Sequence, residues 1–107
     1  MAVRTVNKLV RDRVPGIILE GGEMPSFRIL DDGEFLSALN DKLQEEVAEY
    51  LESGTMEELA DVLQVLHSLS ELLGRGEREL EYFRSEKAAE RGAFRSQVFL
   101  ESIDDMR

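Results

Sequence analysis

Apolar side chains recur every three or four residues in the middle of the chain, and this spacing predicts two helices. One apolar stripe runs through residues 32–52 and a second runs through residues 55–73. Asp31 and Thr55 precede these ranges, and each is followed three residues later by a glutamate, as in a capping box. The stripes consist of Leu36, Leu39, Leu43, Val47 and Tyr50 in the first helix and Met56, Leu59, Val62, Leu63, Leu66, Leu69 and Leu73 in the second.

Glycines divide the rest of the chain. Residues 14–19 predict a short helix that ends at the Gly21-Gly22 pair, and residues 77–91 predict a last helix. Residues 25–30 lack helical spacing, and we expect them to be extended. Residues 97–103 could form a short strand that pairs with residues 27–30. Two strands alone are marginal, so this ribbon is an option within the prediction. The predicted fold class is all-α, a small helical bundle built on an antiparallel helix hairpin.

Length and composition indicate one domain over residues 1–107, without repeats or a linker. No apolar run approaches the roughly 20 residues that span a bilayer, so we expect no membrane partner. The N-terminus lacks the apolar segment of a secretory signal, and there is no cysteine for a disulfide or a thiolate site. These features favour a cytoplasmic protein.

The charge distribution narrows the possible partners. Net charge is −10, with 23 acidic residues against 13 lysines and arginines, which disfavours a nucleic-acid partner. The basic residues gather near both ends, whereas the middle third is acidic. A small anion bridged by a metal ion to the acidic middle fits this layout, and so do the ordinary charged faces of soluble helices. The two basic groups are Lys8, Arg11 and Arg13, and Arg84, Lys87, Arg91 and Arg95.

Two carboxylate pairs stand out on the predicted hairpin. Glu46 and Glu49 are three residues apart on the first helix, and Glu58 and Asp61 are three apart on the second, so each pair can reach one ion. The connection at 53–55 is short, which sets Glu49 level with Glu58 and Glu46 level with Asp61. Helical-wheel angles leave two arrangements open, in which both pairs face each other or both face apart.

The pattern E-E-x-x-E at 45–49 and E-x-x-D at 58–61 resembles the signature of the all-α nucleoside triphosphate pyrophosphohydrolases. That superfamily includes MazG, dimeric dUTPases and phosphoribosyl-ATP pyrophosphohydrolase. The blocks NKLVRD at 7–12 and KAAERGAF at 87–94 are similar to the ends of a single-domain, MazG-like or phosphoribosyl-ATP pyrophosphohydrolase-like branch. The resemblance extends from about residue 6 to residue 101.

The resemblance implies a metal-dependent hydrolase. Mg²⁺, with Mn²⁺ as an alternative, clamps the phosphate chain while water attacks the α-phosphorus and pyrophosphate leaves. By position, the catalytic residues and metal ligands are Glu46, Glu49, Glu58 and Asp61. Candidates to hold phosphate oxygens are Lys8, Arg11, Lys87 and Arg91, for which ion pairs with the protein's own carboxylates are the alternative.

Three functions remain open at this point. The first is a house-cleaning enzyme that converts NTP or dNTP substrates to monophosphate and pyrophosphate. The second is true phosphoribosyl-ATP pyrophosphohydrolase of histidine biosynthesis, and the third is a non-catalytic acidic helical interaction protein. Only eight residues separate Glu49 from Glu58, fewer than in many MazG proteins, which leaves the base selectivity open. Glu45 and His67 are expected to be solvated or structural rather than catalytic.

A homodimer or homotetramer is also expected. Four short helices give a small core, and the metal ligands occupy one face of both motif helices. Val65, Leu72 and Tyr82 lie off the main stripes and offer a second apolar face for a symmetric partner. Cover by the N-terminal segment or the C-terminal strand is the competing interpretation of these three residues.

Overall fold

The computed structural model describes residues 2–105, and this range contains four α-helices and no strand. The all-α prediction is confirmed, and the predicted helix boundaries agree with the observed ones to within a residue or two. The helices are α1 (Val14–Glu20), α2 (Asp32–Ser53), α3 (Met56–Leu73) and α4 (Glu77–Arg91). None of them is long and apolar enough to cross a membrane, among the residues that the structure describes.

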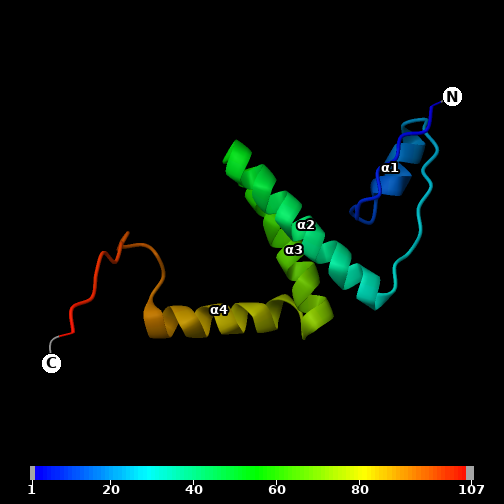
Figure 1. Cartoon of the computed structure of the whole chain (residues 1–107). Helices are drawn as coiled ribbons and strands as arrows, with labels where there is room; N and C mark the ends of the chain where they lie inside the picture. The colour runs from blue at the N-terminus through cyan, green and yellow to red at the C-terminus, as the bar shows by residue number, and fades with distance from the viewer. Residues whose placement is uncertain (1, 106–107) are drawn as a thin grey trace.

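The α2–α3 hairpin is the centre of the fold (Figure 1). Gly54 makes the turn in the left-handed region, with φ 65°, and its N–H donates to the Tyr50 carbonyl at 2.7 Å. Glycine adopts this conformation without the steric cost of a Cβ atom. Thr55 then caps α3, because its hydroxyl accepts a hydrogen bond from the Glu58 backbone N–H at 3.2 Å. At the other end of the hairpin, Asp31 and Glu34 form the predicted capping box of α2.

The core lies between these two helices and is small. Leu39 from α2 and Val65 and Leu69 from α3 are buried, and partly buried neighbours pack around them. Those neighbours are Leu9, Phe35, Leu36, Leu43 and Leu72. Val65 and Leu72 therefore belong to the core of the hairpin and are not part of a second, exposed apolar face as predicted. Tyr82 is 58% exposed on α4.

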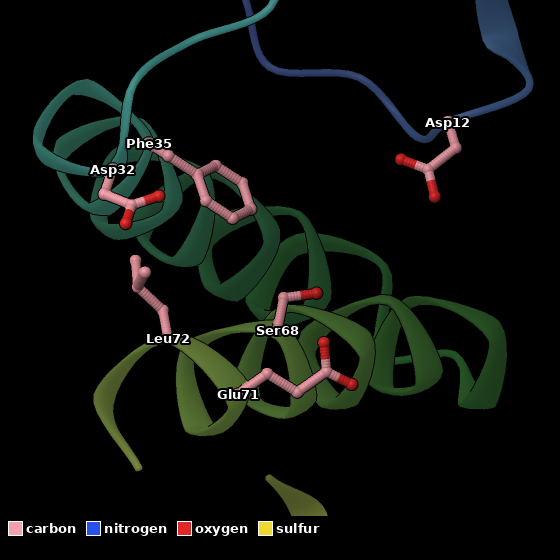
Figure 2. Close-up of a pocket in the computed structure, with 6 residues that line it drawn as sticks. All are labelled: Asp12, Asp32, Phe35, Ser68, Glu71 and Leu72. Carbon is pink, nitrogen blue, oxygen red and sulfur yellow. The ribbon is translucent and has the colours of Figure 1, made fainter. Parts of the chain in front are cut away.

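A cavity of about 340 Å³ opens beside this core, at the end of the hairpin away from the turn (Figure 2). Phe35 contributes its ring from α2, and Ser68, Glu71 and Leu72 line the cavity from α3. Asp32 begins α2, and Asp12 comes from the N-terminal segment that passes the hairpin.

The chain as a whole is extended. Its dimensions are 73 × 31 × 22 Å and its radius of gyration is 19.3 Å, whereas a globular domain of this length has about 13 Å. The helix α4 contacts α3 but not α2, and it projects away from the hairpin (Figure 1). Many large apolar side chains stay exposed in consequence, including Phe83 on α4 at 61% and Phe94 at 96%.

The predicted two-stranded ribbon is absent. Within the described residues, 27–30 and 97–103 adopt no strand, and they lie on opposite sides of the hairpin (Figure 1). Phe27 is 66% exposed and Phe99 is 86% exposed, so neither segment has an apolar surface to pack on. A lone strand pair is marginal without such cover, which accounts for the difference from the prediction.

Candidate metal centre

Carboxylates from the two helices of the hairpin converge on one point. One oxygen each from Glu46, Glu58 and Asp61 lies within 4.8 Å of the others. Of the two arrangements that the sequence left open, the structure has the one in which the face of α2 with Glu46 meets the face of α3 with Glu58 and Asp61. Opposite ligands of an octahedral Mg²⁺ are roughly 4 Å apart, since each bond is about 2.1 Å, so small side-chain movements suffice for one ion to touch all three.

Two of these carboxylates carry buried oxygens with no hydrogen-bond partner. They are Oε2 of Glu46 and Oε2 of Glu58. Buried polar atoms are nearly always satisfied, and an unsatisfied charged one costs more than a neutral one. A hard divalent cation is the natural partner for a set made only of carboxylate oxygens. The residues present therefore fit Mg²⁺ or Mn²⁺.

Glu46 is the most buried of the ligand candidates, with 7% of its surface exposed. Burial raises the pKa of its carboxyl group, and the neighbouring Glu49 carboxylate raises the pKa further through a hydrogen bond and through like charge. Lys42 acts in the opposite direction, because its Nζ lies 3.3 Å from Oε1 of Glu46. A bound cation would remove the cost of holding Glu46 ionised.

Glu49 has a different place from the other three. It is exposed, and its carboxylate lies beside that of Glu46 rather than in the group of three converging oxygens. The resemblance implies Glu49 as a ligand, and the arrangement puts it at the solvent edge of the cluster, next to the most buried member.

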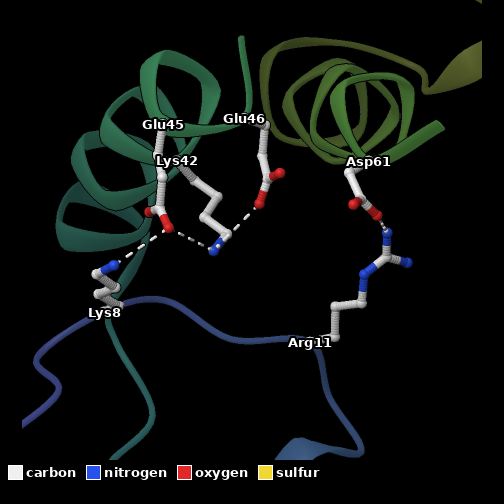
Figure 3. Close-up of polar contacts among 6 residues, drawn as sticks. All are labelled: Lys8, Arg11, Lys42, Glu45, Glu46 and Asp61. Carbon is white, nitrogen blue, oxygen red and sulfur yellow. Dashed lines mark hydrogen bonds and ion pairs between the residues drawn. The ribbon is translucent and has the colours of Figure 1, made fainter. Parts of the chain in front are cut away.

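Basic side chains reach this carboxylate group from the N-terminal segment and from α2 itself (Figure 3). Nη2 of Arg11 lies 2.6 Å from Oδ1 of Asp61, and Nζ of Lys8 lies 3.3 Å from Oε1 of Glu45. Lys42 also approaches Glu45, at 3.5 Å. Burial opposes ionisation of Glu45, but the two lysines outweigh it and hold the pKa of Glu45 below its usual value. Glu45 is therefore an ion-pair partner instead of the solvated side chain that we expected.

Lys42 is the residue that the sequence reasoning missed. It precedes Glu46 by four residues and Glu45 by three, the spacing at which helical ion pairs form. That spacing was visible in the sequence and would have placed a cation beside the ligands.

The four predicted phosphate-binding residues fall into two groups. Lys8 and Arg11 lie at the carboxylates, whereas Lys87 and Arg91 lie on α4, which does not contact α2. Among the described residues, Lys87 and Arg91 form no ion pair. Within one chain, only Lys8 and Arg11 therefore lie beside the carboxylate cluster.

His67 makes a different contact. Its Nδ1 lies 3.1 Å from Oε2 of Glu77, and this contact joins α3 to the start of α4. The contact agrees with the structural role expected for the single histidine.

Comparison with known proteins gives one partial match. An uncharacterized protein of Mycolicibacterium smegmatis (strain ATCC 700084 / mc(2)155) is 52% identical over 42 residues, which cover 39% of this chain and 43% of that relative. The matched segment thus spans less than half of the curated relative. No family model matches the chain, and no solved structure matches it significantly.

Proposed function

We propose that this protein is a Mg²⁺-dependent nucleotide pyrophosphohydrolase, which cleaves NTP or dNTP between the α- and β-phosphates. The carrying observation is the convergence of Glu46, Glu58 and Asp61, with two buried, unpartnered oxygens and a guanidinium at the rim. Carboxylates that converge in a partly buried site repel each other by several kcal/mol at short range, and a bound cation would neutralise this repulsion.

The proposed activity assigns different roles to the carboxylates and to the basic residues. Glu46, Glu58 and Asp61 hold the metal, which when bound neutralises phosphate charge and lowers the pKa of its water. Glu49, at the exposed edge, is placed to complete the coordination or to orient a water. Arg11 and Lys8 are placed to exchange their carboxylate partners for phosphate oxygens when a substrate arrives.

The proposed substrates are canonical or damaged nucleoside triphosphates, as expected of a house-cleaning enzyme. The decisive experiment measures pyrophosphate release from a panel of NTPs, dNTPs and phosphoribosyl-ATP, with and without Mg²⁺. Preferred turnover of phosphoribosyl-ATP would reassign the protein to histidine biosynthesis. Absence of Mg²⁺-dependent release from every compound would leave the acidic interaction protein as the function.

We also propose that the working form is a homodimer or homotetramer. The support is the small core and the apolar surface that one copy leaves open, including Tyr82 and Phe83 on α4. A second copy packed on α4 would bury this surface and bring the partner's α4 toward the hairpin. That geometry would also give Lys87 and Arg91 a route to a phosphate.

A further inference from the structure

We propose that the cavity lined by Phe35 and Ser68 binds the base of the substrate and selects bases that carry an exocyclic amino group. This inference rests on the proposed function, because it names the base that accompanies the phosphates at the carboxylate centre. Adenine, cytosine and guanine carry such a group, whereas uracil and thymine do not.

The position of the cavity relative to the metal centre is the first argument. Asp61 and Ser68 are on the same helix, seven residues apart, which is about 10.5 Å along the axis. Asp12, on the rim of the cavity, directly follows Arg11, whose guanidinium lies on Asp61. A ligand with its phosphates at Arg11 can therefore reach Ser68 along α3.

The size and shape of the cavity are the second argument. Its volume of about 340 Å³ lies at the lower end of the range of small-molecule sites, which suits a nucleoside. The Phe35 ring presents an aromatic surface, and every base has a face that stacks on such a ring (Figure 2). Leu72 supplies apolar contact from α3.

The chemistry of the rim is the third argument. Asp12, Asp32 and Glu71 line the cavity. Their side chains form no ion pair or hydrogen bond with the described part of the chain, so all three carboxylates are free to accept hydrogen bonds from a ligand. An ionised carboxylate accepts but never donates. The rim therefore repels phosphate and suits an amino group, which donates hydrogen bonds to a carboxylate. The single ring N–H that uracil or thymine can offer there lies between two carbonyl acceptors, which the carboxylates repel.

A second metal ion is a poor occupant of the same cavity. Among the described residues, the group of acidic side chains close enough to share an ion is the one at Glu46, and no such group forms here. The three rim carboxylates are spread around the cavity (Figure 2). Acceptors that are spread apart suit the edges of a flat ligand.

The test compares kcat/KM for CTP, ATP and GTP with that for UTP and dTTP, and GTP with ITP, which lacks the 2-amino group. Wild type should prefer each amino-bearing base by about tenfold, the effect of one hydrogen bond to a charged acceptor. Glu71→Gln should shift this preference toward UTP, because an amide can donate to a carbonyl. Phe35→Leu should raise KM for all nucleotides, and Glu57→Gln serves as the exposed control.

Inorganic tripolyphosphate, which has no base, should inhibit wild type and both cavity variants equally. Turnover without base preference, unchanged by Glu71→Gln, would overturn the inference and leave the proposed function standing. If wild type hydrolyses no nucleotide, the proposed function fails, and ¹H–¹⁵N NMR titration with cytidine and uridine tests the cavity directly. Shifts at Phe35 and Ser68 with cytidine but not uridine would then support the site, and shifts with neither would overturn it.

Discussion

Arg11 and Asp61 form a 2.6 Å ion pair although they are 50 positions apart in the sequence. The guanidinium holds the N-terminal segment against the carboxylate cluster and neutralises the Asp61 carboxylate. A metal ion bound at this cluster would therefore compete with Arg11 for Asp61, and a phosphate that contacted both cations would relieve that competition.

Arg11→Gln should separate the competition of Arg11 with the metal ion from its proposed contact with phosphate. We expect tighter Mn²⁺ or Mg²⁺ binding, by severalfold, because the competing cation is gone, together with a lower kcat/KM because a phosphate contact is lost. Isothermal titration calorimetry and pyrophosphate release measure the two effects. Arg13→Gln makes the same charge change without a described ion pair and is the matched control. Weaker metal binding in Arg11→Gln than in the control would argue against the competition.

Alanine at Asp61 or Glu49 should abolish Mg²⁺ binding and activity with helix content nearly unchanged. Each variant removes one carboxylate, and Glu57→Gln is the control at an exposed position of α3. Without metal, Glu46→Gln should melt at a higher temperature than wild type, since it removes a buried charge beside Glu49. Circular dichroism and calorimetry give these values. Full Mg²⁺-dependent turnover in either alanine variant would remove that residue from the site.

Lys87→Ala and Arg91→Ala should reduce triphosphate turnover and weaken competition by pyrophosphate. Because α4 does not contact α2 within one chain, we expect this effect to come from a neighbouring copy. Mixing Asp61→Ala with Arg91→Ala chains should then restore part of the activity that each lacks alone. A lower melting temperature with unchanged kinetics would mark both residues as structural.

Stability should depend on pH through Glu34. The Arg28 hydrogen bond, followed by the Asp31 backbone N–H, lowers the pKa of Glu34 below its usual value. A carboxyl group with a lowered folded-state pKa stabilises the fold above its unfolded pKa of about 4.3, and this stabilisation disappears as pH falls through the folded-state pKa. Glu34→Gln should therefore melt below wild type at pH 7 and together with it at pH well below 4. Arg28→Gln should behave similarly, and a pH-independent difference would contradict the pairing.

Oligomer formation should be visible by sedimentation equilibrium at micromolar concentration. We expect a dimer or tetramer, because a monomer leaves Phe83 61% exposed and burial of such a side chain contributes about 1.5–3 kcal/mol. Phe83→Glu should shift the equilibrium toward smaller species. A strictly monomeric wild type with full activity would remove the second copy from the proposal.

The sequence predicted the helices well because each carries its own local signals. The caps Asp31 and Thr55 and the turn at Gly54 define α2 and α3 without reference to the rest of the chain. Counting residues from that turn also shows that Glu46 and Asp61 lie at the same height along the hairpin. Their convergence did not follow, because two wheel orientations satisfied the same pattern and the packing of Leu39 on Val65 and Leu69 decides between them.

Other features depend on contacts between distant segments, which the local pattern of the sequence does not encode. Arg11 reaches Asp61 through the path of an irregular segment, and no periodicity specifies such a path. The optional strand at 97–103 did not form, because a short apolar stretch needs a neighbouring surface to pair with or pack on. The cavity at Phe35 was missed because its lining comes from three separate segments.

The two-residue connection of Gly54 and Thr55 also limits how this protein can vary. A longer connection would no longer hold α3 at a fixed height along α2, and a shift of one residue within a helix is about 1.5 Å. Glu58 and Asp61 would then leave the level of Glu46, while every cap and apolar stripe stayed locally intact. Insertions and deletions at this turn should therefore be purged in any lineage that keeps the carboxylate cluster, although the turn contains none of its carboxylates, and changes of length should accumulate in the N-terminal and C-terminal segments instead.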